Sequence, residues 1–159
     1  MRTLFAAALA IVSLPALADL ASLQVFAQSG SPQAKACMQY ASLFSEAYGL
    51  LQAGRTEQVT INRLLDKYST SFKDQEQKNS LARIVTGVTM TASGLSRLHR
   101  ENAAVAYLEM CRQRSLGLWP KEKAEETMRA RMTAGEQCQT IVPQGASQQN
   151  CVVLAFERR

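Results

Sequence analysis

The sequence is short of the residues that most often carry catalysis. It contains one histidine, one tryptophan and 6% aromatic residues, and only 19% of its residues are charged. The motifs H-E-x-x-H, G-x-S-x-G, G-x-x-x-x-G-K-[ST] and G-x-G-x-x-G do not occur, so zinc peptidases, α/β-hydrolases, P-loop and dinucleotide-binding enzymes lack motif support. The single histidine, His99, lies between arginines with only Glu101 as a nearby carboxylate, which favours a surface position over general-base catalysis.

The residues that are present suffice for one compact domain. The 159 residues are 47% hydrophobic and carry a formal net charge of +5, which is neither the composition of a disordered chain nor that of a membrane channel. The arginines are scattered, and aromatic residues do not interleave them as a stacking platform for bases would require. We therefore expect no nucleic-acid partner and no cofactor.

The first 18 residues have the pattern of a secretory signal peptide. Arg2 is followed by an apolar run from Leu4 to Leu14, and Ala16-Leu17-Ala18 supplies the small residues of a cleavage site. A second candidate site follows Ala27, because residues 20–26 are still apolar. Either site predicts a periplasmic or secreted protein with no stable membrane insertion after cleavage.

The chain after the signal peptide divides into two parts. We expect a polar N-terminal segment at 19–31 and a single helical domain at 32–159. Apolar residues recur in this domain at spacings of three and four, as in amphipathic helices. The expected elements are helices at about 32–53, 58–69, 102–113 and 120–134, and a further helix whose apolar face runs from Leu81 to Leu95. The expected N-caps are Ser31 and either Thr56 or Thr60, and Gly54, Gly117 and Gly135 are expected helix ends.

The fold class is therefore mainly all-α, a bundle of four to five helices with a small C-terminal element. Two β-branched runs, Thr140-Ile141-Val142 and Cys151-Val152-Val153, flank a Pro/Gly turn and favour a hairpin. A final short helix from Ser147 fits the tail as well.

The four cysteines predict two structural disulfides. Export places them in an oxidising compartment, and their number is even. Cys37 and Cys111 lie on the apolar stripes of long helices, whereas Cys138 and Cys151 flank one tail element. We therefore expect the pairs 37–111 and 138–151. No C-x-x-C or zinc-ligand spacing occurs.

Two groups of residues are candidates for contacts with a partner. Arg97 and Arg100, extended by the arginines at 112 and 114, predict a basic patch for an acidic protein, an anionic lipid or a cell-wall polymer. Trp119 beside Met128 has the composition of a protein-binding hot spot, although packing of the fifth helix explains it too.

A catalytic alternative rests on carboxylates. Glu46 and Glu109 lie on the helices that carry Cys37 and Cys111, so they could approach each other and serve a cell-wall-active enzyme.

Two resemblances bear on function. The stretch Ala36-Cys37-Met38-Gln39-Tyr40-Ala41, then Gly54-Arg55, and Tyr107-Leu108-Glu109-Met110-Cys111 resembles small proteobacterial periplasmic proteins of unknown function. The tail from Ile141 to Gln149 is similar to a proline-glycine turn of helical periplasmic immunity proteins that neutralise cell-wall amidases.

Export, the absent catalytic motifs and the rigid cross-linked helical scaffold together predict a non-catalytic periplasmic binding protein. We expect its partner to be another envelope or exported protein, and its role to be that of an inhibitor or immunity protein for an envelope-targeted enzyme. A structural envelope role is a third alternative.

Overall fold

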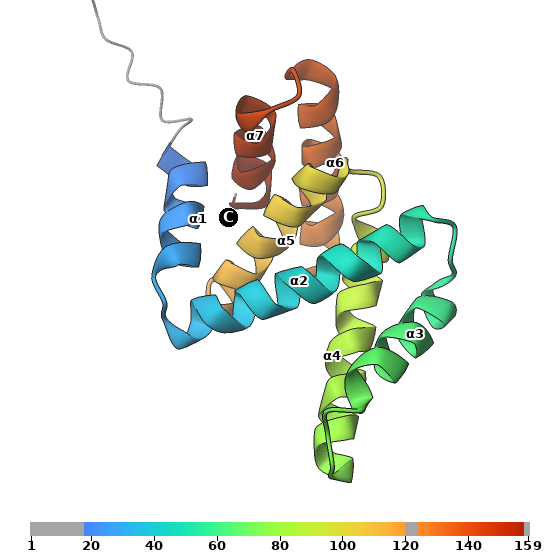
Figure 1. Ribbon diagram of the computed structural model, residues 1–159. Coiled ribbons are helices and arrows are strands. Elements are labelled where there is room, and N and C mark those ends of the chain that lie inside the picture. Colours follow the sequence, from blue (N-terminus) through green and yellow to red (C-terminus); the bar gives the residue numbers. More distant parts are fainter. Residues whose placement is uncertain (1–17, 120–123, 158–159) are drawn as a thin grey trace, which may run out of the picture.

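A computed structural model describes residues 18–119 and 124–157, which form seven α-helices and contain no strand (Figure 1). The predicted signal peptide, apart from its last residue, lies outside this range. The helices are α1 Ala18–Gln28, α2 Pro32–Gln52, α3 Glu57–Ser69, α4 Gln75–Gly94, α5 Arg100–Ser115, α6 Ala124–Ile141 and α7 Ala146–Glu157.

The starts of the helices follow from local capping chemistry. The Ser31 hydroxyl accepts the N–H of Ala34 at the start of α2, and the Thr56 hydroxyl accepts that of Val59 at the start of α3, which satisfies backbone donors that have no partner inside the helix. Gly54 adopts φ +78° directly after α2, a conformation that glycine reaches without strain. These predicted boundaries are confirmed.

Helix α2 lies at the centre of the bundle (Figure 1). It packs against α4 on one side and α5 on the other, while α3 pairs with α4, and α6 and α7 pair beside α5. Phe44 of α2 and Tyr107 of α5 stack with ring centroids 4.4 Å apart. The core extends through buried side chains of every helix from α2 to α7, among them Leu64, Val85, Leu95, Met110, Cys138 and Phe156.

Both predicted disulfides are confirmed. The Cys37–Cys111 bond joins α2 to α5, and the Cys138–Cys151 bond joins α6 to α7, each with 5.7 Å between the two Cα atoms. The all-α class is confirmed as well, with more helices than the four to five expected because short helices stand at both ends of the described chain.

The tail is a helix, α7, so of the two alternatives the short helix from about Ser147 is confirmed and the hairpin is wrong. Val152 and Val153 lie in α7 with fully buried side chains. Their β-branched side chains favour strands only weakly, and burial against α5 and α6 decides the conformation instead.

Gly135 does not end a helix, contrary to prediction, but lies inside α6. A Cβ atom at this position would lie 3.2 Å from Phe156 Cε2 and 3.4 Å from Leu98 Cδ2. The glycine therefore permits close packing of α6 on its neighbours.

The segment 19–31 is mostly helical rather than a polar tail. Within it, α1 buries Leu23, which is 2% exposed, and contacts α2, α5 and α7. Among the helices of residues 18–119 and 124–157, none combines the length and the hydropathy of a membrane-crossing segment.

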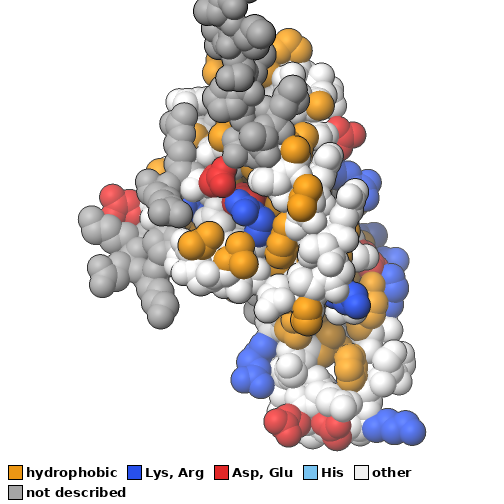
Figure 2. Space-filling view, turned by 90° about the vertical axis from the view of Figure 1, so that its left-hand side faces the viewer, with side chains coloured by type: hydrophobic (Ala, Val, Ile, Leu, Met, Phe, Trp, Pro, Cys, Tyr) orange, Lys and Arg blue, Asp and Glu red, His pale blue; other side chains and the backbone are white. Residues whose placement is uncertain are grey.

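The surface carries no single continuous apolar face in the view of Figure 2. Hydrophobic side chains are interspersed there with polar ones, and charged side chains of both signs gather at the lower end, near the connection between α3 and α4.

Candidate functional site

A groove with a volume of about 530 Å³ lies beside Trp119, the single tryptophan of the chain. Trp119 follows the end of α5, and the groove runs between α4 and α6. Its other lining residues are Met90, Thr91, Gly94, Arg114, Ala124, Glu125, Met128 and Arg129. The structure thus brings together Trp119 and Met128, as the sequence suggested, and adds Met90 from another helix.

Two guanidinium groups lie over the indole ring of Trp119. The Arg114 guanidinium is 5.0 Å from a ring centroid, and that of Arg131 is 4.6 Å from it. Each distance lies within the range of a cation–π interaction. Trp119 is half-buried, so it is held in place while part of its surface stays accessible.

Arg131 connects Trp119 to the core. It is only 4% exposed, and its Nη1 donates to Gln113 Oε1 at 2.8 Å. Gln113 Nε2 in turn donates to Glu109 Oε1 at 2.6 Å and to the carbonyl of Phe156 at 2.8 Å. Burial lowers the pKa of Arg131, and the negative charge of Glu109 acts in the opposite direction.

Glu109 is fully buried and is engaged by two neighbours on its own helix. Arg112 donates to both of its oxygens, from Nε at 2.7 Å and from Nη2 at 2.9 Å, and also binds Glu157 at 3.1 Å. The hydrogen bonds to Glu109 raise the pKa of Arg112 against the effect of burial. This geometry is that of a structural ion pair, closed off from solvent on the carboxylate side.

Glu46, the other carboxylate considered, belongs to a separate cluster between α2 and α3. It accepts hydrogen bonds from Lys67 Nζ at 2.8 Å and from the Tyr68 hydroxyl at 2.8 Å. Burial raises the pKa of Glu46, but these hydrogen bonds and the charges of Lys67 and Arg63 outweigh it, and the net pKa is lowered. Each of the two carboxylates is thus engaged by different neighbours, Glu46 by Lys67 and Tyr68 and Glu109 by Arg112 and Gln113.

Arg97 and Arg100 do not join the groove of Trp119. Both are exposed beside the turn between α4 and α5 and line a different depression with Tyr48. Arg97 Nη1 lies 3.8 Å from Glu136 Oε1, with a side chain that is 79% exposed, so this ion pair is weak.

The arginines at 112 and 114 do not extend the pair Arg97 and Arg100, because their side chains make other contacts. The arginine at 112 binds carboxylates in the interior, and Arg114 lies over Trp119. His99 is exposed and precedes α5 without a side-chain cap bond.

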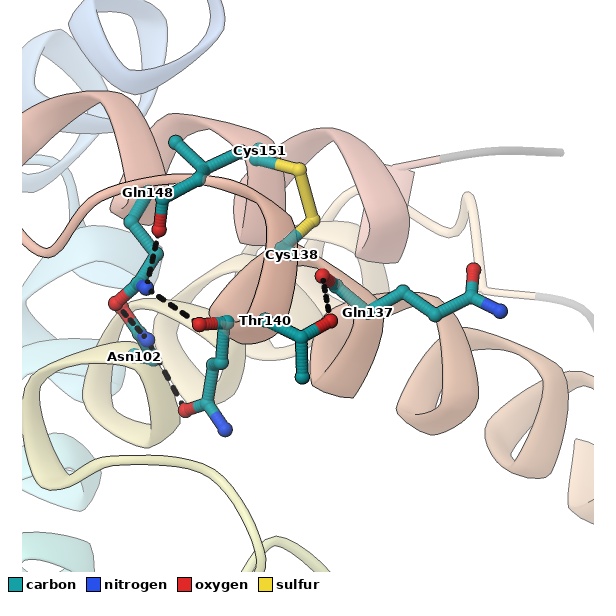
Figure 3. Close-up of a disulfide and its surroundings, with 8 residues drawn as sticks. Asn102, Gln137, Cys138, Thr140, Gln148 and Cys151 are labelled. Carbon is teal, nitrogen blue, oxygen red and sulfur yellow. Dashed lines mark hydrogen bonds between the residues drawn. A yellow bond between two sulfur atoms is a disulfide. The ribbon is translucent and has the colours of Figure 1, made fainter.

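A second polar network fixes α5, α6 and α7 beside the Cys138–Cys151 bond (Figure 3). Asn102 Nδ2 donates to Gln148 Oε1 at 2.8 Å and to Gln139 Oε1 at 3.0 Å. Gln148 Nε2 donates to the carbonyl of Val142 at 2.8 Å and to that of Gln139 at 3.2 Å, which caps the end of α6. These glutamines, which sequence reasoning missed, serve the scaffold.

No group of three or more histidine, cysteine, aspartate or glutamate residues that could hold a metal ion occurs in residues 18–119 and 124–157. Comparison of the chain with protein-family models, curated proteins and solved structures gave no significant match.

Proposed function

We propose that this chain is an exported binding protein without a catalytic role. Its partner would be another exported or envelope protein, and its role that of an inhibitor or immunity protein for an envelope-targeted enzyme. The observation that carries the proposal is the groove in which Trp119 lies under two guanidinium groups, between Met90 and Met128.

The composition of this groove supports recognition of a protein. Tryptophan, methionine and arginine are enriched in protein interfaces, and tryptophan and arginine contribute most often to binding energy. Met90 is 60% exposed in the C-terminal third of α4. Most of its apolar surface is therefore open to contact with a partner.

The charges of the groove indicate which chemistry the partner presents. Among the described residues that line it, the charged ones are Arg114, Arg129 and Glu125. We propose that the partner inserts an apolar side chain against the methionines and places an acidic residue next to it, toward the two arginines. Such complementarity affects partner choice and association rate more than affinity.

The scaffold supports binding with little loss of entropy. The two disulfides connect four helices, and the hydrogen bonds of Arg131 and Gln113 tie the groove to the core. A surface that is rigid before binding avoids part of the ordering cost of association.

Export of the protein is supported by three observations. The first 18 residues have the signal-peptide pattern. All four cysteines are paired, as is usual outside the cytosol. The tail also resembles that of periplasmic immunity proteins. We do not propose a cell-wall-active enzyme, because Glu46 and Glu109 are both engaged by cationic partners.

The proposal is tested by affinity capture from envelope extracts with three baits: the wild-type mature protein, Trp119→Ala and Met38→Ala. Met38 is 46% exposed and lies outside the groove, so it is the matched control. We expect one enzyme to bind the wild-type and Met38→Ala baits and not Trp119→Ala, and its purified activity to fall when the chain is added. Equal capture by all three baits, or unchanged enzyme activity, would contradict the proposal.

A further inference from the structure

We infer that the export peptidase cuts the chain between Ala18 and Asp19, and that α1 is the first helix of the mature domain. The sequence leaves two sites open, after Ala18 and after Ala27, and α1 occupies the stretch between them. This inference rests on the proposed export.

The first argument is that α1 is an integral part of the fold. Leu23 is 2% exposed, and α1 contacts three other helices, α2, α5 and α7. Figure 1 shows α1 lying alongside the bundle, joined to α2 by a short turn. That turn is built from Gly30, with φ +67°, and Ser31, which caps α2.

The second argument is a hydrogen bond that joins α1 to the last helix of the chain. The backbone N–H of Leu20 donates to Asn150 Oδ1 of α7 at 3.0 Å, across 130 positions of the sequence. This hydrogen bond ties the N-terminal half of α1 directly to α7. Residues 20–28 are therefore held by the fold through a polar contact as well as through Leu23.

The two cleavage sites therefore have opposite consequences. A cut after Ala18 keeps residues 20–28 of α1, with the buried Leu23 and the hydrogen bond from Leu20, in the mature protein. A cut after Ala27 falls in the last turn and removes Leu23 from the core. It also leaves the Oδ1 of Asn150, a residue only 3% exposed, without its donor.

The experiment is expression of the full precursor in a Gram-negative host, followed by mass spectrometry of the N-terminal peptide from the periplasmic fraction. The inference predicts a mature protein that begins Asp19-Leu20-Ala21. A mature protein that begins Gln28-Ser29-Gly30 would overturn it while leaving export intact. An unprocessed chain confined to the cytoplasm would overturn export and this inference together.

Two variants add a matched comparison in the same host. Ala18→Leu puts a large residue at the predicted site and should cause the precursor to accumulate, whereas Ala27→Leu should be processed like the wild type. The reverse pattern would overturn the inference. As a readout independent of processing, Leu23→Ala should lower the melting temperature of the mature protein, and an unchanged melting temperature would show that α1 is dispensable.

Discussion

The role of Glu109 can be decided by one conservative substitution, Glu109→Gln. The carboxylate is fully buried, and three donor atoms point at its two oxygens: two from Arg112 and one from Gln113. A glutamine fills the same volume but replaces one acceptor oxygen by an NH2 group, which then faces a donor. It also removes the charge that balances the Arg112 guanidinium.

The structure sets the size of the effect. Removing one partner of a buried ion pair costs about 3 to 5 kcal/mol. Because Arg112 keeps a hydrogen bond to Glu157, and its side chain is 15% exposed, we expect the lower end, about 3 kcal/mol. For a domain of this size that corresponds to a fall in melting temperature of about 6 to 12 °C.

The assay is urea unfolding of the purified mature protein, with Glu46→Gln as the control. Glu46 pairs with a lysine whose side chain is 54% exposed, so its loss should cost no more than about 1 kcal/mol. The structural role is refuted if Glu109→Gln unfolds at the same urea concentration as the wild type. If the wild type degrades peptidoglycan and Glu109→Gln loses that activity while it keeps its stability, the result would instead support the catalytic alternative.

Three further predictions test packing, cross-linking and ionisation. Cys111→Ser removes the disulfide to Cys37, which lies 74 positions earlier in the sequence. Because the unfolded chain then gains conformational entropy, the free energy of unfolding should fall by about 4 kcal/mol, as measured by calorimetry. Gly135→Ala should lower the free energy of unfolding by about 1 kcal/mol, because crowding against Phe156 and Leu98 outweighs the gain in helix propensity. Gly87→Ala, in the open middle of α4, should raise it by about 0.5 to 1 kcal/mol. Equal effects of the two substitutions in thermal melts would contradict the close packing at Gly135. Burial raises the pKa of Tyr107 to about 12. Between pH 10 and 12 the unfolded chain therefore loses this proton before the folded chain does, and the free energy of unfolding falls as pH rises. A phenolate absorbance titration in which every tyrosine ionises near pH 10 before the protein unfolds would refute this.

Much of the fold could be predicted because local rules and packing agree along α2 to α5. The spacing of apolar residues and the caps Ser31 and Thr56 set the positions of α2 and α3. α4 begins at Gln75, before the apolar face that starts at Leu81, and α5 begins at Arg100, two residues before the expected start. The disulfide pairing was predictable for the same reason, since Cys37 and Cys111 lie on the apolar stripes along which α2 and α5 pack against each other.

The errors occur where tertiary contacts override a local signal. Gly135 has the chemistry of a helix end, yet it is needed inside α6 for contact with Phe156 and Leu98. Val152 and Val153 favour a strand but are buried in a helix. Likewise, the apolar residues of α1 read as an extension of the leader, because the surface that buries Leu23 comes from helices far along the chain.

The candidate site shows the same limit. Trp119 and Met128 were predictable as neighbours because a short stretch of chain separates them. Met90 was not, because only the packing of α4 brings it to the groove. The arginines at 112 and 114 are also close in sequence, but their side chains serve an interior ion pair and the tryptophan respectively.

The most direct test of the proposed partner site is photo-crosslinking in the periplasm of living cells. A photoreactive residue replaces Met128 in the groove or, as a control, Val59, which is 48% exposed on α3. The proposal predicts a discrete adduct with one exported or envelope protein from position 128 only, and its loss when Trp119→Ala is added. The absence of an adduct at position 128, or an adduct that forms equally from position 59 and survives Trp119→Ala, would contradict it.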